Sequence, residues 1–260
     1  MSGSRKQAVA NGRRERPPRP VGTRSRARQP GRRRRRAAAE IAAVLLVAGA
    51  ITAFATSWGP SSTGAPSSQA VGFATPAGIP VYGPLGPEKV PLEIGPALAP
   101  PNVGLTGATI DGIGCNASEQ LVYHHHVHLA IFVDGRPYSL PLGVGMVAPV
   151  IAEDTPAGEF ALGSQRCLYW AHVHAQDGIV HIESPEARAF TLGQVMDIWH
   201  VVLAPGQLGS FSGVVTATVN GQPWPGNPAS IPLDQHAQIV LNVGAPIIAP
   251  PPISWAGTGL

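Results

Sequence analysis

The sequence is poor in cysteine and, beyond its first segment, poor in basic residues. It has two cysteines in 260 residues, and 14 of its 18 lysines and arginines lie in residues 1–36. Zinc-finger cysteine spacing, a Gly-rich phosphate loop and a Ser-His-Asp signature are all missing. Residues 59–260 carry 13 acidic residues against four basic ones, so we expect no nucleic-acid partner for this part of the chain.

A basic arm and an apolar run occupy the first 58 residues. Residues 1–36 are interrupted by Pro and Gly, which predicts a disordered cytoplasmic arm that contacts anionic membrane lipid. Residues 37–58 are uncharged from Ile41 onward and approach the roughly 20 apolar residues that a membrane helix needs. The Arg32–Arg36 block places the amino terminus in the cytoplasm by the positive-inside rule. The sequence therefore predicts a single-pass signal-anchor in the cell membrane, with the main domain extracytoplasmic.

A cleaved signal peptide is the alternative for this segment. Ala53-Phe54-Ala55 fits the small-x-small cleavage pattern. The preceding basic region is far longer than that of an ordinary secretory signal, which favours the uncleaved anchor. Both alternatives place the main domain outside the cytoplasm.

Composition divides the rest of the chain into a linker, a domain and a tail. Residues 59–104 are rich in Pro, Gly and Ser, which is typical of a semi-extended linker. Residues 105–246 are expected to form the extracytoplasmic β-domain, and residues 247–260 a flexible tail. Apolar residues of the domain recur mostly with a period of two between Gly-containing turns, and one capping box begins at Thr191. We therefore expect a mainly β fold, a β-sandwich or small barrel with one short helix.

The expected strands cover residues 121–133, 138–142, 146–152, 166–175, 179–183, 211–219 and 237–243, and the expected helix continues through residues 195–201.

The two cysteines, Cys115 and Cys167, agree with an oxidising compartment and predict one disulfide. Closing such a loop contributes on the order of 4 kcal/mol in the chain-entropy model. Cys167 as a thiolate metal ligand is the alternative, because it lies five residues before His172. A blue-copper site is disfavoured, since no Met follows Cys167 at the usual spacing.

The most informative segment is a predicted hairpin centred on Asp177-Gly178. With a two-residue turn, His174 lies opposite His181 and His172 lies opposite Glu183. Opposed side chains have Cβ atoms about 4.5–5.5 Å apart on one face of a sheet. Three imidazoles and a carboxylate then converge, which predicts a metal site. A three-residue loop would break this register.

A second histidine cluster lies upstream. His124, His126 and His128 share one face of a predicted strand, and His125 falls on the other face. These three either complete the hairpin site or form a second one. A histidine-rich strand without any ligand is the simpler alternative. Two clusters that hold seven of the nine histidines favour metal.

The metal ion and its chemistry stay open at this point. Imidazole ligands suit Cu, Zn or Fe, so a transition metal ion is the expected cofactor. Four protein ligands would close a tetrahedral zinc site, whereas octahedral iron or manganese would keep positions for substrate. Glu183 could alternatively act as a general base or orient a histidine. We expect a membrane-anchored metal-binding protein; the alternatives are a cupin-like oxidative metalloenzyme and a structural envelope protein without metal.

The segment Cys-Leu-Tyr-Trp-Ala-His-Val-His at 167–174, followed by His-Ile-Glu-Ser-Pro at 181–185, resembles a family of largely uncharacterised extracytoplasmic bacterial and archaeal proteins. The upstream His126-Val-His128 segment and Phe190-Thr-Leu-Gly-Gln continue the resemblance, which spans roughly residues 120–200. It implies a common domain but no particular activity. Other members carry Thr-His-Asp where this chain has Val173-His174-Ala175, so a polar partner of the site is missing here and catalysis is less favoured.

Overall fold

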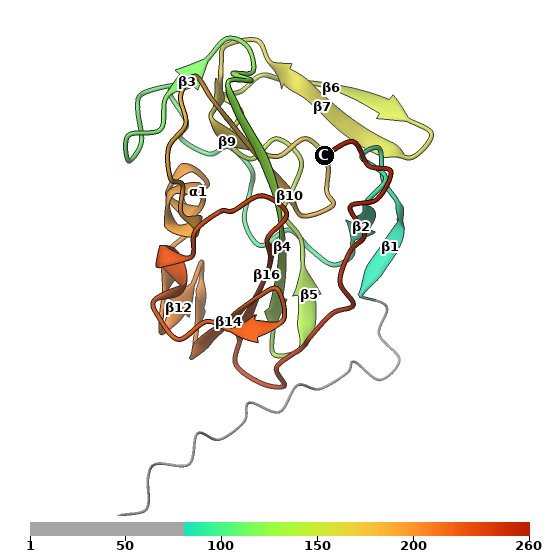
Figure 1. Ribbon diagram of the computed structural model, residues 1–260, viewed down its shortest axis with the longest axis vertical. Helices are drawn as coiled ribbons and strands as arrows, with labels where there is room; N and C mark the ends of the chain where they lie inside the picture. The colour runs from blue at the N-terminus through green and yellow to red at the C-terminus, as the bar shows by residue number, and fades with distance from the viewer. Residues whose placement is uncertain (1–80) are drawn as a thin grey trace, which may run out of the picture. The chain divides into compact units, whose positions relative to one another are not determined.

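The computed structural model describes residues 81–260 (Figure 1). The described chain is mainly β with one α-helix, as the sequence predicted, but its strands do not close into a barrel. None of its helices is long and apolar enough to span a membrane. The predicted arm, the predicted signal-anchor and the first part of the predicted linker lie outside the described residues.

A central sheet organises the described chain, and its strands follow the order β15-β14-β16-β4-β10-β9, with β5 also paired to β4. β16 runs parallel to β4, and the other pairs in this sheet are antiparallel. The strands of this sheet are β4 (Tyr123–Val133), β5 (Arg136–Tyr138), β9 (Ala171–His172), β10 (Ile179–Ser184), β14 (Val215–Val219), β15 (Gln222–Pro223) and β16 (Gln238–Val243).

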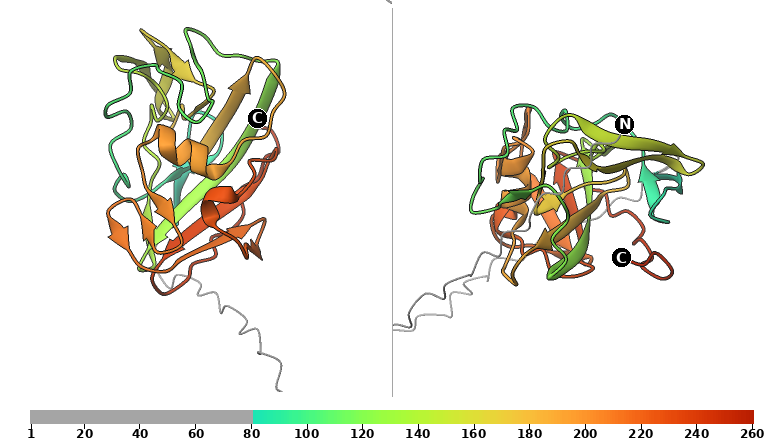
Figure 2. Two further views of the ribbon diagram at one scale, coloured as in Figure 1. Left: turned by 90° about the vertical axis from the view of Figure 1, so that its left-hand side faces the viewer. Right: turned by 90° about the horizontal axis from the view of Figure 1, so that it is seen from above.

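Four small sheets surround the central one. They pair β1 (Tyr82–Leu85) with β2 (Pro91–Glu93), β3 (Cys115–Asn116) with β8 (Leu168–Tyr169), β6 (Val150–Thr155) with β7 (Gly158–Ser164), and β11 (Leu203–Ala204) with β12 (Gln207–Leu208) and β13 (Phe211–Ser212). The helix α1 spans Leu192–Ile198, and a 3-10 turn spans Pro228–Ser230. Figures 1 and 2 show α1 and the β1–β2 pair on opposite sides of the central sheet.

Local sequence signals account for several of these elements. The Asp134-Gly135 and Asn220-Gly221 turns join β4 to β5 and β14 to β15, and both residues of each turn have positive φ, as a type I′ turn requires. The Gln194 side chain accepts a hydrogen bond from the Thr191 amide (3.0 Å), which is half of the predicted capping box. The strand expected at residues 146–152 lies at Val150–Thr155 as β6, and its partner β7 was not predicted.

The two faces of the central sheet are buried in different ways. The odd-numbered residues of β4 from Val127 to Val133 join the main apolar core together with α1. The even-numbered residues lie on the other face, which continues on β10 with Ile179, His181 and Glu183. We call this second surface the histidine face.

The histidine face is covered by segments that composition had assigned to the linker and to the tail. Val90 and Ile253 pack there against Ile179. The Asn242 side chain exchanges two hydrogen bonds with the backbone of Ile248 (3.1 and 2.8 Å). The linker prediction is therefore wrong for residues 81–104 and the tail prediction is wrong for 247–260, because apolar residues between the prolines are buried by the sheet.

Cys115 of β3 and Cys167, which directly precedes β8, form the predicted disulfide, so the thiolate-ligand alternative is wrong. Replacing both cysteines with alanine should lower the free energy of unfolding by about 4 kcal/mol, because the bond closes a long loop and restricts the unfolded chain. Urea unfolding of the variant and of the parent protein measures this difference. Equal stabilities would contradict a structural role for the disulfide.

Glu93 of β2 is a buried carboxyl that accepts a hydrogen bond from the Leu140 amide (2.7 Å). Burial, together with the neighbouring charge of Asp177, raises its pKa well above the usual value. A raised pKa means that Glu93 stabilises the fold most below the ordinary glutamate pKa of about 4.3, and that this stability is lost as the pH rises towards the higher value.

In Glu93→Gln, the side-chain oxygen can still accept the hydrogen bond from the Leu140 amide, but the side chain cannot ionise. Its stability relative to the parent protein should therefore increase with pH above about 4.3, by up to about 1.4 kcal/mol per pH unit. Urea unfolding of both proteins between about pH 4 and pH 7 measures this trend. If the two proteins showed the same dependence of stability on pH, Glu93 would ionise as an exposed glutamate does.

Candidate metal centre

The pairing of β10 with its two neighbours brings the histidines together. On the β4 side, Glu183 lies opposite His124, and His181 lies opposite His126. On the β9 side, His181 lies opposite His172. The sequence had predicted His174 opposite His181 and His172 opposite Glu183, and this register is wrong by two residues. Because side chains alternate with a period of two, the side chains still share the predicted face.

A longer loop explains the changed register. Residues 173–178 form a loop instead of continuing the strands into a two-residue turn. Its carbonyl groups accept hydrogen bonds from other parts of the fold: His174 from the Ala161 amide, Gln176 from the Glu93 amide and Gly178 from the Leu129 amide, each at 2.8 Å. These contacts satisfy the loop backbone, so the local preference of Asp-Gly for a tight turn is overridden.

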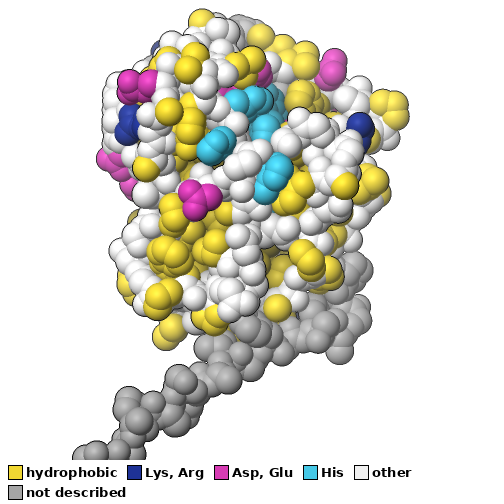
Figure 3. Space-filling view, viewed as in Figure 1, with side chains coloured by type: hydrophobic (Ala, Val, Ile, Leu, Met, Phe, Trp, Pro, Cys, Tyr) yellow, Lys and Arg dark blue, Asp and Glu magenta, His cyan; other side chains and the backbone are white. Residues whose placement is uncertain are grey.

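Two adjacent groups of side chains could each hold a metal ion. Within each group, one ligand atom per residue lies within 4.8 Å of the others. The first group is Glu119, His172, His174 and Glu183, and the second is His124, His126 and His181. Figure 3 shows histidine side chains gathered together on one face of the molecule.

The pair His172 and His174 has the most constrained geometry. The Nδ1 atoms of His172 and His174 lie 2.8 and 2.5 Å from the carbonyl oxygens of Tyr169 and Ala161. A carbonyl oxygen only accepts, so both Nδ1 atoms carry hydrogen and both Nε2 atoms present lone pairs. These two Nε2 atoms face each other at 2.9 Å. For metal–nitrogen bonds of about 2.1 Å, ligands at right angles are about 3 Å apart.

Two carboxylates approach this pair. The distance from Glu183 Oε2 to His172 Nε2 is 3.7 Å, and that from Glu119 Oε1 to His174 Nε2 is 3.6 Å. The Phe160 ring of β7 stacks on His174, with centroids 5.0 Å apart, and so holds the imidazole plane. The first group thus offers two nitrogen and two oxygen donors.

The second group lies along β4 and β10. Glu183 Oε1 is 3.2 Å from His124 Nε2 and 3.5 Å from His181 Nδ1. Both ring nitrogens of buried His126 lack a hydrogen-bond partner within the described chain. Buried polar atoms without partners are costly, and a metal ion would satisfy one of these nitrogens.

Protonation differs among these histidines. Burial, together with the neighbouring imidazoles, holds the pKa of His172 well below its usual value and lowers that of His174 to about 4 and that of His126 to about 3. Burial also disfavours charge on His181, but Glu183 and Glu88 outweigh it and raise the pKa of His181 to about 9. Most of the site is therefore neutral imidazole, which is the form that binds metal.

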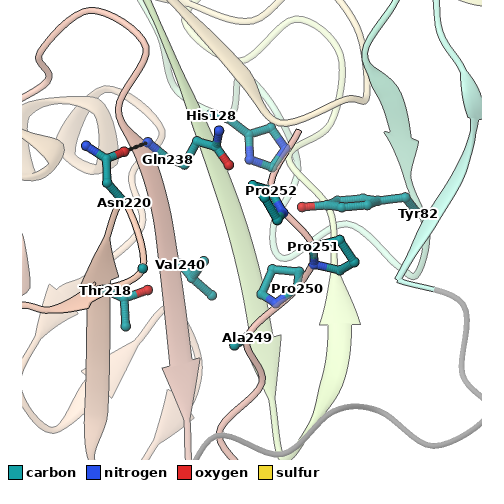
Figure 4. A pocket seen from close by; sticks show the side chains of 11 residues that line it. Tyr82, His128, Thr218, Asn220, Gln238, Val240, Ala249, Pro250, Pro251 and Pro252 are labelled. Atoms are coloured by element: carbon teal, nitrogen blue, oxygen red, sulfur yellow. Dashed lines mark hydrogen bonds between the residues drawn. The ribbon is translucent and has the colours of Figure 1, made fainter. Parts of the chain in front are cut away.

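His128, which the sequence placed among the ligands, lies outside both groups. It points into a separate cavity of about 300 Å³ lined by Tyr82, Gln238 and the prolines 250–252 (Figure 4). The Tyr82 and His128 rings meet edge to face, with centroids 5.8 Å apart. Strand rise explains its distance from His124, because residues four apart on a strand are about 13 Å from each other.

Two acidic residues of the site were missed by the sequence analysis. Glu119 lies in the segment before β4, and Glu88 lies between β1 and β2, in the predicted linker. Glu88 Oε1 is 2.8 Å from His181 Nε2. Neither residue is in a motif. The only available signal was the scarcity of acidic residues in the linker, where Glu88 and Glu93 are the two present.

The cluster opens into a cavity of about 280 Å³. Six of the clustered side chains line it together with Phe160, Leu162, Gly259 and Leu260. The side chains of Glu119 and His124 are 40% and 38% exposed, whereas those of the other clustered residues are buried. The site therefore has a buried interior and one accessible side.

Comparison with protein-family models, with curated proteins and with solved structures finds no match to this chain. The fold and the site by themselves define a mainly β domain with a buried cluster of histidines and carboxylates.

Proposed function

We propose that this chain is a transition-metal-binding protein. The observation that carries the proposal is the His172–His174 pair, in which two Nε2 lone pairs face each other at 2.9 Å while both Nδ1 atoms are engaged by carbonyl oxygens. Carbonyl groups that fix the tautomer in this way are the usual outer partners of metal-binding histidines. The ligand chemistry suits Cu, Zn or Fe.

The alternative without metal needs a proton between the two Nε2 atoms. Such a proton would place a positive charge on a pair that is buried and lies beside His181. Burial and that neighbour lower the pKa values of both histidines, so the proton is disfavoured. A metal ion removes the repulsion between the lone pairs and also draws in the carboxylates of Glu119 and Glu183.

The test is the metal content of the full-length protein purified from its native host, measured by inductively coupled plasma mass spectrometry. Stoichiometric Cu, Zn or Fe is expected in the parent protein. His172→Ala and His174→Ala should lower the content and weaken binding by at least about a hundredfold, since even residues that only orient ligands contribute about ten- to hundredfold.

His125→Ala is the matched control, because His125 lies between His124 and His126 on the same strand but on its other face, in neither group. The control should keep the metal content of the parent protein. A metal-free parent protein, or equal metal content in all the variants, would contradict the proposal.

A metal-dependent enzyme is the second candidate function. It is favoured by the cavity of about 280 Å³ beside the cluster, which gives an exogenous small molecule access to the ligand atoms. The analogy with cupins depends on ligand type alone, since the described strands do not close into a barrel.

We also propose that the domain works outside the cytoplasm, held at the cell membrane by residues 37–58. The disulfide between Cys115 and Cys167 supports an oxidising compartment, and the basic block before the apolar run supports the orientation. No protein partner is proposed.

Protease added to intact protoplasts tests this location. The domain should be degraded, while a tag fused before residue 1 stays protected until the membrane is permeabilised. A cytoplasmic marker protein serves as the control for intact protoplasts. Protection of the domain in intact protoplasts would contradict the extracytoplasmic location.

A further inference from the structure

Glu183 occupies a special position between the two histidine groups. Its Oε1 atom is 3.2 Å from His124 Nε2 and 3.5 Å from His181 Nδ1. Its other oxygen, Oε2, is 3.7 Å from His172 Nε2. The two oxygens of one buried carboxylate therefore face two different sets of imidazoles.

The donors are too many for one ion. Five imidazoles and two carboxylates make seven donor residues, whereas an octahedral metal ion takes six ligands. The donors also separate into two compact groups, each within 4.8 Å, rather than one sphere. The groups are nonetheless adjacent: the His174 and His181 rings, one from each group, have centroids 4.5 Å apart.

We propose that the site binds two metal ions bridged by the Glu183 carboxylate, an inference that rests on the metal-binding function proposed above. One ion takes His124, His126 and His181, and the other takes His172, His174 and Glu119. Paired metal ions in proteins lie about 3.5–4 Å apart, a distance that a bridging carboxylate spans.

Glu88 has a positioning role in this arrangement. Its Oε1 atom is 2.8 Å from His181 Nε2, which directs the other ring nitrogen, Nδ1, towards Glu183 and the β4 histidines. A carboxylate behind a metal-binding imidazole fixes the orientation of the ring and increases the basicity of the ligand atom. Glu88 therefore completes the ion site on the β4 side without being a ligand itself.

Each group has one partly exposed side chain at the cavity, His124 on the β4 side and Glu119 in the other group. His172 is fully buried, while the side chain of His124 is 38% exposed at the cavity. The ion held by His124, His126 and His181 has three imidazoles and one carboxylate oxygen, so an octahedral ion there keeps open positions.

Copper is the probe for the experiment, because Cu²⁺ binds imidazole sites most strongly among the divalent metals of this series and is paramagnetic. The full-length protein is loaded with Cu²⁺ and passed over a chelating resin to remove loosely bound ion. Copper per chain is then measured by mass spectrometry, and coupling between ions by electron paramagnetic resonance. Two ions per chain and a spectrum of coupled Cu²⁺ pairs are expected.

Variants in each ligand group test the two ion sites separately. His124→Ala/His126→Ala and His172→Ala/His174→Ala should each keep one Cu²⁺ per chain with the spectrum of an isolated ion. Glu183→Gln should abolish the coupling, because an amide does not bridge two ions as a carboxylate does. His125→Ala should keep both ions and their coupling.

The outcomes distinguish this inference from the proposed function. One ion in the parent protein, lost from both double variants, would show a single shared site and overturn the two-ion inference while metal binding stands. No bound ion in the parent protein would overturn both the two-ion inference and the proposed metal-binding function. Two ions without coupling, unchanged in Glu183→Gln, would overturn the bridging role. Urea unfolding identifies variants that do not fold, in which case the stoichiometry and coupling of the parent protein decide.

Discussion

The antiparallel pairing of β10 with β4 is the constraint on which the candidate site depends. It sets Glu183 against His124 and His181 against His126. Since side chains alternate along a strand, a slip of one residue would turn these groups into the apolar core beside α1 and bring Ile182 to the histidine face. Burial of the opposite face therefore fixes the register that assembles the site.

The segments that cover the histidine face are as important for the candidate site as the central sheet. Residues 81–93 and 247–260 pack over it, and they remove water from imidazoles that would otherwise lie on a solvated strand surface. Removing water favours uncharged imidazole, which leaves nitrogen lone pairs available to a cation. His181 is the exception, because Glu88 reaches it from the covering segment and adds a negative charge next to the ring.

The site combines features that a purely structural histidine cluster would not need. Backbone carbonyl groups orient two rings, a carboxylate lies between the two groups, and one side opens into a cavity. In a structural core, apolar residues of similar volume would fill the same space without the cost of burying polar atoms. This cost is offset if the donors hold metal ions, which is why the metal-binding function fits the geometry best.

Short-range signals in the sequence predicted much of the fold. The strand periodicity of 121–133 and 237–243, the Asp134-Gly135 and Asn220-Gly221 turns, and the capping box at Thr191 all depend on residues close together in the chain. The disulfide was also predictable, because two cysteines leave only one possible pairing.

The sequence by itself determined which histidines share a face, because strand alternation is a local property of the backbone. Only the tertiary structure decided how that face is assembled. It set His172 rather than His174 opposite His181, left His128 in another cavity, and brought Glu88 from the supposed linker. These outcomes depend on contacts between distant segments, whose backbone hydrogen bonds and buried apolar area outweigh the preference of a single turn.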